Sequence, residues 1–251
     1  MSYNRFISVA VGARGTGKTY SCKMRALKRE KSTVWLRRYA EDIKPSNGLG
    51  ERFLADLPPE IRDSYFYYGN AIWKVQDATE KSIEKDSLAP KEGAIPKITF
   101  VALSTARRMK SQSWHNYDLI VYDEFIESSG GRYLSDEYAI FLDLLETICR
   151  LRSDIRVLMC ANNVSLINPY FAQWGIGTAI MPPDDGKGFR KVGKDVIIEW
   201  VKPDDDYLDA KLNSAIGRLS QGTQWANMSV YNLSPTDEFY GVEKRPTSAK
   251  Y

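Results

Sequence analysis

The sequence is poor in the residues that build metal centres and catalytic triads. It contains one histidine, His115, and a single histidine cannot complete a zinc site or a triad. Its three cysteines, Cys22, Cys149 and Cys160, lie in separate apolar stretches and lack CxxC spacing. We therefore predict buried free thiols, which fit a reducing compartment.

Long apolar runs and a strong charge imbalance are also missing. No apolar stretch is long enough to cross a bilayer, and the N-terminus reaches a glycine turn before a signal-peptide core can develop, so we expect no membrane partner. Lysine and arginine number 35 against 32 acidic residues. This balance does not point to nucleic acid, and any such partner must meet a local basic patch.

Short apolar runs rich in β-branched residues alternate with helix-like segments. Strands are predicted at residues 6–11, 33–36, 65–68, 71–75, 98–103, 119–122 and 157–160. Helices are predicted at residues 18–31 and after Ser135, which we interpret as an N-cap. The second helix has an apolar face formed by Tyr138, Phe141, Leu142, Leu145, Ile148 and Cys149. The alternation predicts an α/β fold, a mainly parallel sheet covered by helices.

The texture of the sequence changes near residue 182. A polar stretch with glycine and proline leads to a predicted strand at residues 196–201 and a helix near residues 207–219. We therefore predict a core at residues 1–181 and a small lid or linker subdomain at residues 182–251. The charged segment at residues 77–95 is predicted to be a surface loop.

A complete GxxxxGK[ST] pattern, GARGTGKT, lies between the first predicted strand and the first predicted helix. Glycines allow the backbone amides to turn around phosphates, Lys18 would neutralise the β and γ phosphates, and Thr19 would offer its hydroxyl to Mg²⁺. ATP is expected rather than GTP, because no NKxD-type segment is present. The predicted nucleotide-binding residues are Gly12, Ala13, Arg14, Gly15, Thr16, Gly17, Lys18, Thr19 and Tyr20.

The segment LIVYDE, at residues 119–124, supplies the acids that such a phosphate loop requires. Asp123, at the end of a predicted buried strand, is placed to hold Mg²⁺ together with Thr19. Glu124 is placed to polarise the attacking water, which favours an enzyme that hydrolyses ATP over a small-molecule kinase.

Three polar residues could act on the γ-phosphate. Arg14 lies inside the loop and could act in cis, whereas Arg150 follows the second helix and points away from its apolar face, as a finger donated to a neighbouring subunit must. From these residues alone an ordinary helix C-terminal cation is the slightly favoured interpretation of Arg150, and Arg152 and Arg156 compete with it. Asn162 follows a buried strand and could sense the γ-phosphate or cap a turn.

Taken together, these segments resemble the DNA packaging ATPases, or DNA encapsidation proteins, of small tailed phages with protein-primed linear double-stranded DNA genomes. The matching stretches run in order from residue 2 to about residue 245. They are SYNRFISVAVGARGTGKTY, VWLRRY, LIVYDEFI, NVSLINPYF, the GRL around Arg218 with its following GT, and a final EKR.

The resemblance implies an ASCE-type P-loop fold and ATP-driven threading of double-stranded DNA into a preformed capsid. The partners that it implies are double-stranded DNA, the phage portal and other copies of the chain in a ring, a pentamer by analogy. It implies action in the host-cell cytoplasm, transiently on the procapsid and not in the mature virion. By position it makes Arg150 the trans-acting finger and Asn162 the start of the segment that couples hydrolysis to movement.

Family members usually continue beyond the EKR segment into a second, nuclease-like domain. We therefore expect either an excised motor domain or a short family member, with any contact to a structural RNA depending on the part that is absent. Two other functions stay open at this stage. One is a nucleotide-gated assembly factor, and the other is a helicase-like or clamp-loader-like ATPase.

A DNA translocase must grip phosphates without reading bases, so basic loops are the expected contacts. We favour the cluster before the acidic strand because its loop contains few core residues. The candidates are Arg37, Arg38, Arg107, Arg108 and Lys110, followed by Lys187, Arg190, Lys191 and Lys194 in the predicted appendage.

Overall fold

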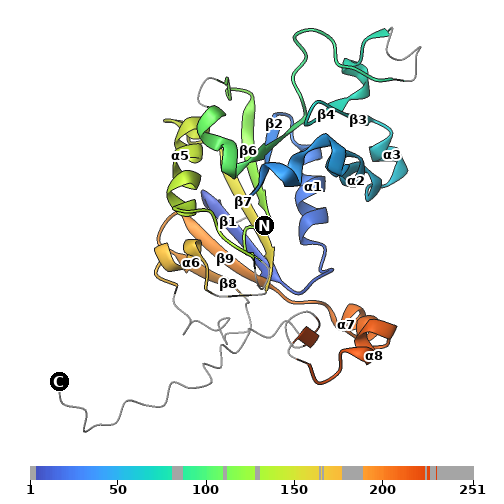
Figure 1. Ribbon diagram of the computed structural model, residues 1–251, viewed down its shortest axis with the longest axis vertical. Coiled ribbons are helices and arrows are strands. Elements are labelled where there is room, and N and C mark those ends of the chain that lie inside the picture. The colour runs from blue at the N-terminus through green and yellow to red at the C-terminus, as the bar shows by residue number, and fades with distance from the viewer. Residues whose placement is uncertain are drawn as a thin grey trace, which may run out of the picture.

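The computed structural model describes residues 4–80, 87–109, 112–127, 131–163, 165, 167–176, 189–223, 225–226 and 230. Its centre is a sheet of nine strands in the order β3-β4-β5-β2-β6-β7-β1-β9-β8 (Figure 1). The strands are β1 (Ile7–Gly12), β2 (Ser32–Arg37), β3 (Tyr65–Tyr68), β4 (Ala71–Lys74), β5 (Ile98–Ala102), β6 (Tyr117–Asp123), β7 (Arg156–Asn162), β8 (Phe189–Val192) and β9 (Val196–Val201).

The six inner strands, from β5 to β9 in the sheet order, run parallel, while β3, β4 and β8 pair antiparallel at the two edges. The inner strands are nearly continuous apolar runs because helices cover both faces of the sheet. One strand, β7, lies between β1, which leads into the phosphate loop, and β6, which ends in the acidic pair. The predicted mainly parallel, helix-covered α/β fold is confirmed.

Helices α1 and α2 lie on one face of the sheet and α5 and α6 on the other, whereas α7 and α8 lie away from both faces (Figure 1). One apolar cluster contains α1 and α2 residues, and the other contains α5 and α6 residues. The α-helices are α1 (Lys18–Lys28), α2 (Leu49–Ala55), α3 (Pro59–Arg62), α5 (Glu137–Cys149), α6 (Pro169–Gln173), α7 (Asp205–Leu212) and α8 (Ala215–Leu219). The 3₁₀ helices are η1 (Ala40–Ile43), η2 (Pro45–Asn47), η3 (Val75–Asp77) and η4 (Leu103–Met109).

The apolar face predicted for α5 is wrong at one position. Leu142 is 45% exposed, whereas Leu144 is 1% exposed. The buried face follows the spacing i, i+3, i+4, i+7, i+8 from Phe141, and Leu144 belongs to that row. The predicted cap is wrong too, because Asp136 is the N-cap residue, in a left-handed conformation, and Ser135 lies outside the helix.

The region after residue 181 also differs from expectation. The strand β9 pairs in parallel with β1, so it belongs to the main sheet and not to an appendage. The expected helix at 207–219 is two helices, because Ser214 leaves the helical path and its hydroxyl accepts the Gly217 N–H at 3.0 Å. Among the described residues after Val201, a lid can therefore begin no earlier than α7.

The prediction for the cysteines is confirmed. All three cysteines are buried free thiols. The segment at residues 77–95 is described only in part: Asp77 ends η3, Glu80 is helical, and Ala78, which is buried, forms an isolated bridge with Pro90. Across all the residues that the structure describes, no helix is both long and apolar enough to cross a membrane.

Candidate nucleotide site

The glycine loop joins β1 to α1 at the carboxyl end of the parallel strands, where open sheets place their ligands. Gly15 and Gly17 have φ values of 81° and 75°, which residues with a Cβ adopt only at a cost. Gly17 is the N-cap of α1, whose first turn carries no acidic residue. The unpaired amides and the positive end of this helix therefore face the loop without a competing carboxylate.

Lys18 points back into the loop that precedes it. Its Nζ donates to the carbonyl oxygens of Gly12 and Ala13, at 3.0 and 2.6 Å, and lies 3.1 Å from the Thr16 hydroxyl. Burial lowers the pKa of Lys18 to about 8, and the nearby positive charge of Lys211 acts in the same direction. A buried ammonium held among loop carbonyls is suited to a phosphate group.

Thr19 and Asp123 meet across the end of the sheet. The Thr19 hydroxyl donates to Asp123 Oδ1 at 3.1 Å, and the Cys160 thiol lies 3.1 Å from the same oxygen. Hydroxyl and carboxylate oxygens are ligands that Mg²⁺ accepts, so this predicted pair fits the ion. No cluster of three histidine, cysteine or acidic side chains suited to a metal occurs among the described residues.

Glu124 lies directly beyond β6 in a left-handed conformation, with φ at 58°. Its N–H donates to the Cys160 carbonyl at 2.8 Å, and its side chain is 59% exposed. Left-handed backbone in a residue other than glycine costs about 1–3 kcal/mol and is concentrated at functional sites. Glu124, whose carboxylate was predicted to polarise the attacking water, therefore lies at the carboxyl end of β6 and is accessible to a ligand.

Arg37 is the main member of the site that sequence reasoning placed elsewhere. It was predicted to contact DNA, but its side chain is only 18% exposed and donates to Asp123 Oδ2 at 3.2 Å and to Glu124 Oε2 at 2.6 Å. Burial disfavours the charge of Arg37, but the two carboxylates outweigh it and raise its pKa. The sequence carried only part of this signal, since it placed Arg37 directly after a predicted strand, whereas the pairing of β2 with β6 comes from the fold.

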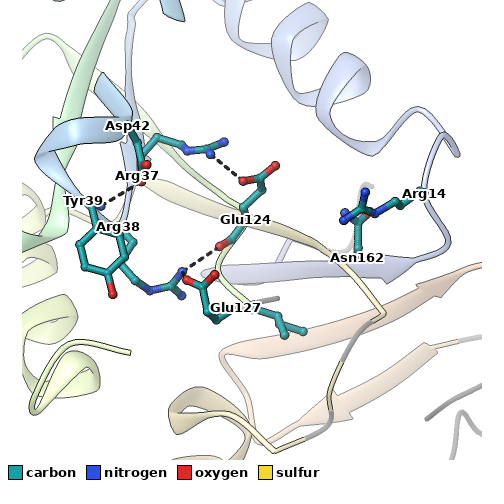
Figure 2. A pocket seen from close by; sticks show the side chains of 9 residues that line it. Arg14, Arg37, Arg38, Tyr39, Asp42, Glu124, Glu127 and Asn162 are labelled. Atoms are coloured by element: carbon teal, nitrogen blue, oxygen red, sulfur yellow. Dashed lines mark hydrogen bonds and ion pairs between the residues drawn. The ribbon is translucent and has the colours of Figure 1, made fainter. Parts of the chain in front are cut away.

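A cavity of about 200 Å³ opens beside these groups. Figure 2 shows Arg14 next to Asn162 on one side and Glu124 facing the cavity from the other. Asn162 ends β7 opposite Gly12, so the sheet register brings it to the loop. The lining residues are Arg14, Arg37, Arg38, Tyr39, Asp42, Glu124, Ile126, Glu127 and Asn162.

Arg150 does not reach this cavity. It is exposed, directly follows α5 and shares a hollow with Trp114, His115 and Arg152. Those residues precede β6 and β7, so the hollow lies at the amino end of the parallel strands, opposite the phosphate loop. Arg150 is the C-cap residue of α5, with φ at 48°, so it lies just beyond the helical turns from which its direction was predicted.

The remaining predicted DNA contacts separate into buried and exposed residues. The prediction for Arg38 is wrong, because its side chain is 4% exposed and pairs with Glu127 and Glu137. Arg107 and Arg108 are exposed on η4, and Lys194 is exposed between β8 and β9. Outside the described residues, or outside their described side chains, lie Lys110, Lys187, Arg190 and Lys191.

Helix α7 contacts the phosphate loop, a feature that the sequence pattern did not reveal. The Tyr207 hydroxyl and the Lys211 ammonium both donate to the Arg14 carbonyl at 2.9 Å. A Cβ added to Gly15 would lie 1.9 Å from the Tyr207 hydroxyl. Tyr20, the last of the predicted nucleotide-binding residues, is 42% exposed on α1.

A glycine loop between a buried strand and a helix, facing an aspartate and a glutamate across a parallel sheet, defines a nucleotide-binding protein of the P-loop class. Comparison with known families narrows this class. The family model described as podovirus DNA encapsidation protein (Gp16) matches residues 1–251. The chain belongs to this family, and the ASCE-type fold expected from its sequence is the one observed.

Individual relatives agree with this assignment. The DNA packaging proteins of Bacillus phages PZA and phi29 are each 30% identical over 262 residues, which cover 100% of this chain and 69% of theirs. The crystal structure of the N-terminal domain of the phi29 DNA packaging ATPase is similar with a TM-score of 0.62 and 27% identity, covering 81% of this chain and 94% of that one. The structure of the phi29 viral genome packaging motor assembly is similar with a TM-score of 0.63 and 27% identity, covering 100% of this chain and 69% of that one.

Proposed function

We propose that this protein hydrolyses ATP and uses the free energy to drive double-stranded DNA into a preformed phage capsid. The observation that carries the proposal is the meeting of Thr19, Asp123 and Glu124 at one end of the sheet, beside the phosphate loop. Relatives named as packaging proteins and as a packaging ATPase support the DNA part of the proposal.

The residues divide the chemistry among them. The loop amides and Lys18 bind the phosphates, and Thr19 with Asp123 would hold Mg²⁺, which neutralises phosphate charge when bound. Glu124 accepts a hydrogen bond from the attacking water and orients it. Arg37, bound to both carboxylates, sets where the Glu124 side chain points in the structure, and Asn162 and Arg14 face the same cavity from β7 and the loop.

The proposed partners follow from the family. They are double-stranded DNA, the portal of an empty capsid, further copies of this chain in a ring and a structural RNA on the portal. The exposed pair Arg107 and Arg108 is the proposed DNA contact among the described residues. The setting is the host cell, transiently at the procapsid.

Replacing Glu124 by Gln tests this function against the alternative of a nucleotide-gated assembly factor. The variant should bind ATP with nearly unchanged affinity, because Glu124 does not touch the phosphate loop, and should lose hydrolysis by about 10²–10³-fold. Packaging of DNA into empty capsids should stop with it. Glu146→Gln, an exposed carboxylate on α5, is the matched control and should behave as the unmodified protein.

If Glu124→Gln packaged DNA at the full rate, hydrolysis would be incidental and the assembly factor would be the better description. Stimulation of hydrolysis distinguishes the remaining alternative. A motor on duplex DNA should be stimulated by duplex and not by single strands, whereas a helicase-like ATPase should show the opposite preference. The same assay, repeated across protein concentrations, should show cooperative dependence on the protein if a ring is the active form.

A further inference from the structure

Arg38 is a buried arginine whose hydrogen-bonding capacity is fully used. Its side chain is 4% exposed. The guanidinium donates to Glu137 at 2.8 and 3.1 Å, to Glu127 at 2.7 Å, and to the carbonyl oxygens of Glu124 and Phe125 at 3.3 and 2.6 Å. Two of its five bonds therefore go to the backbone directly after Asp123, at the point where the catalytic carboxylate leaves the sheet.

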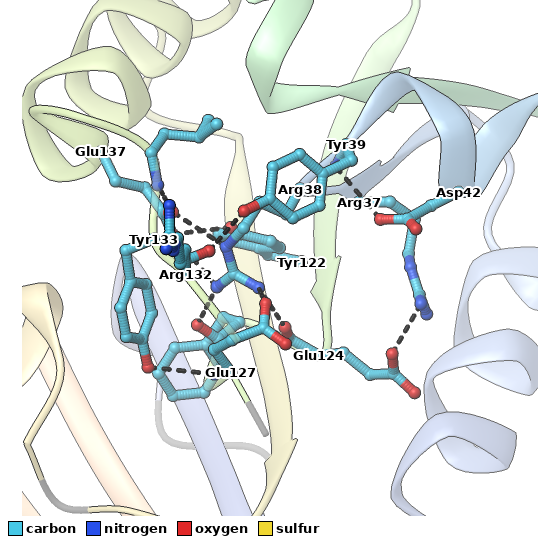
Figure 3. A network of polar contacts seen from close by, with 12 residues as sticks. Arg37, Arg38, Tyr39, Asp42, Tyr122, Glu124, Glu127, Arg132, Tyr133 and Glu137 are labelled. Atoms are coloured by element: carbon cyan, nitrogen blue, oxygen red, sulfur yellow. Dashed lines mark hydrogen bonds and ion pairs between the residues drawn. The ribbon is translucent and has the colours of Figure 1, made fainter. Parts of the chain in front are cut away.

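Glu137, the first residue of α5, supplies the counter-charge and is itself fully enclosed, with a side-chain exposure of 0%. Its carboxylate also accepts bonds from the Tyr122 hydroxyl at 3.1 Å, the Tyr170 hydroxyl at 2.8 Å and the Leu134 N–H at 2.9 Å. Figure 3 shows Arg38 between Glu137 on one side and the chain at Glu124 and Glu127 on the other. The network thus joins β2, β6, α5 and α6 around one guanidinium.

Arg38 binds the backbone at Glu124, which has a strained, left-handed conformation. Glu124 has a φ of 58°, and its N–H is held by the Cys160 carbonyl on β7. Its own carbonyl and that of Phe125 are held by Arg38. A left-handed conformation persists in such a residue only where the surroundings over-determine it, and these bonds do so from both sides.

Stability alone is a poor explanation for this arrangement. A buried ion pair loses its hydration, and apolar residues of similar volume often serve a core as well or better. Burial disfavours the charge of Arg38, but the bond to Glu137 and the neighbouring carboxylates outweigh that effect and raise its pKa, so the guanidinium stays charged. A permanent charge with a rigid planar fork is suited to holding two successive carbonyl groups in one geometry.

We propose that Arg38, anchored by Glu137, is a positioning residue that fixes the direction of the Glu124 carboxylate through the Glu124 and Phe125 carbonyl groups. The inference rests on the proposed hydrolysis of ATP and deepens it. Arg37 and Arg38 then have separate tasks, since Arg37 binds the carboxylates themselves and Arg38 holds the backbone that carries one of them.

The test is Arg38→Lys in the full chain, because lysine keeps the charge and loses the planar fork. We expect kcat to fall at least about tenfold, while the Kd for a slowly hydrolysed ATP analogue changes less than about threefold. In a Glu124→Gln background, the same substitution should cause no further loss in single-turnover hydrolysis, because its effect passes through Glu124. Equal losses in both backgrounds would overturn the proposal, as would a loss of ATP affinity that parallels the loss of rate.

Two further variants keep the result interpretable. Arg29→Lys is the matched control, because Arg29 forms a two-bond pair with Asp118 at 2.8 and 2.5 Å away from the site, and it should lower thermal stability without lowering kcat. Glu137→Gln removes the counter-charge with little change of shape, so it repeats the comparison if Arg38→Lys does not fold. A full rate in Glu137→Gln together with a full rate in Arg38→Lys would also overturn the proposal.

The proposed hydrolysis of ATP and the positioning role of Arg38 can be contradicted separately. If the unmodified protein does not hydrolyse ATP, or if Glu124→Gln is as active as the unmodified protein, the proposed function is wrong. If Glu124→Gln abolishes hydrolysis and Arg38→Lys leaves kcat unchanged, only the positioning role of Arg38 is wrong.

Discussion

Two consecutive arginines at the end of β2 show how much the environment of a residue decides. The sequence predicted both as basic loop residues that contact DNA. In the structure Arg37 pairs with Asp123 and Glu124, and Arg38 is buried. Adjacent side chains near the end of a strand point in different directions, and here each direction has its own acidic partner. Neither arginine is available to a DNA phosphate in this structure without breaking an ion pair.

A prediction at this scale concerns Lys18. Burial lowers its pKa to about 8, and only the protonated amine attracts phosphate, so kcat/KM for ATP should fall as the pH rises through about 8. Lys211→Met removes a neighbouring positive charge that lowers this pKa further, so the alkaline limb should move to higher pH. The measurement is the pH profile of kcat/KM, which reports groups of the free enzyme. A limb at the same pH in both proteins would contradict this assignment.

Among the elements, α7 has the most unexpected position. Its Tyr207 and Lys211 reach the Arg14 carbonyl, and the Lys211 ammonium lies 5.5 Å from the centre of the Tyr207 ring. The helix therefore touches the phosphate loop rather than extending away from the core. A larger residue at position 15 would meet the tyrosine hydroxyl, so the Tyr207 side chain would have to move from this contact.

Two glycines of the loop allow this contact to be measured. Gly15 and Gly17 share a left-handed backbone, but a Cβ on Gly17 would meet nothing within 4 Å. Without nucleotide, Gly17→Ala should lower the free energy of unfolding by about 1–2 kcal/mol through backbone strain alone. Gly15→Ala should lower it by more, and Tyr207→Ala should bring the two losses together. Equal losses in the presence of Tyr207 would show that α7 does not rest on the loop.

At the scale of the whole molecule, the two arginines proposed to act on the γ-phosphate lie at opposite ends of the parallel strands. Arg14 lines the cavity beside Glu124, whereas Arg150 lies beyond α5 at the amino end of the strands. Arg150 therefore does not line the nucleotide site of its own chain, and the proposed finger role requires a second copy of the chain. In a ring, Arg150 would reach a nucleotide if the amino end of the strands in one subunit faced the carboxyl end of the strands in the next.

Mixing two inactive variants tests this arrangement. Lys18→Ala disables the phosphate loop, and Arg150→Ala disables the proposed finger, so neither protein should hydrolyse ATP alone. Mixed rings should recover part of the activity, because some interfaces combine an intact loop with an intact arginine. Hydrolysis measured across mixing ratios checks this, and no recovery at any ratio would favour Arg14 acting in cis.

The local pattern of the sequence was sufficient for the phosphate loop, the acidic pair and the inner strands, since each depends on neighbours within a few residues. The spacing of glycines, Lys18 and Thr19 specifies a loop whatever the rest of the chain does, and a fully apolar run before Asp123 specifies a buried strand. The exposure of Leu142 was not predictable in this way, because the phase of α5 depends on how it packs against the sheet.

Only the tertiary structure decided which distant residues share the site. Arg37 meets Glu124 because β2 and β6 are neighbours, and Asn162 reaches the loop because β7 pairs with β1. Strand order and the docking of α7 depend on contacts between residues far apart in the chain, which no local pattern encodes. The sequence by itself determined what chemistry the loop and the acids can perform, and the fold determined which side chains orient and restrain them.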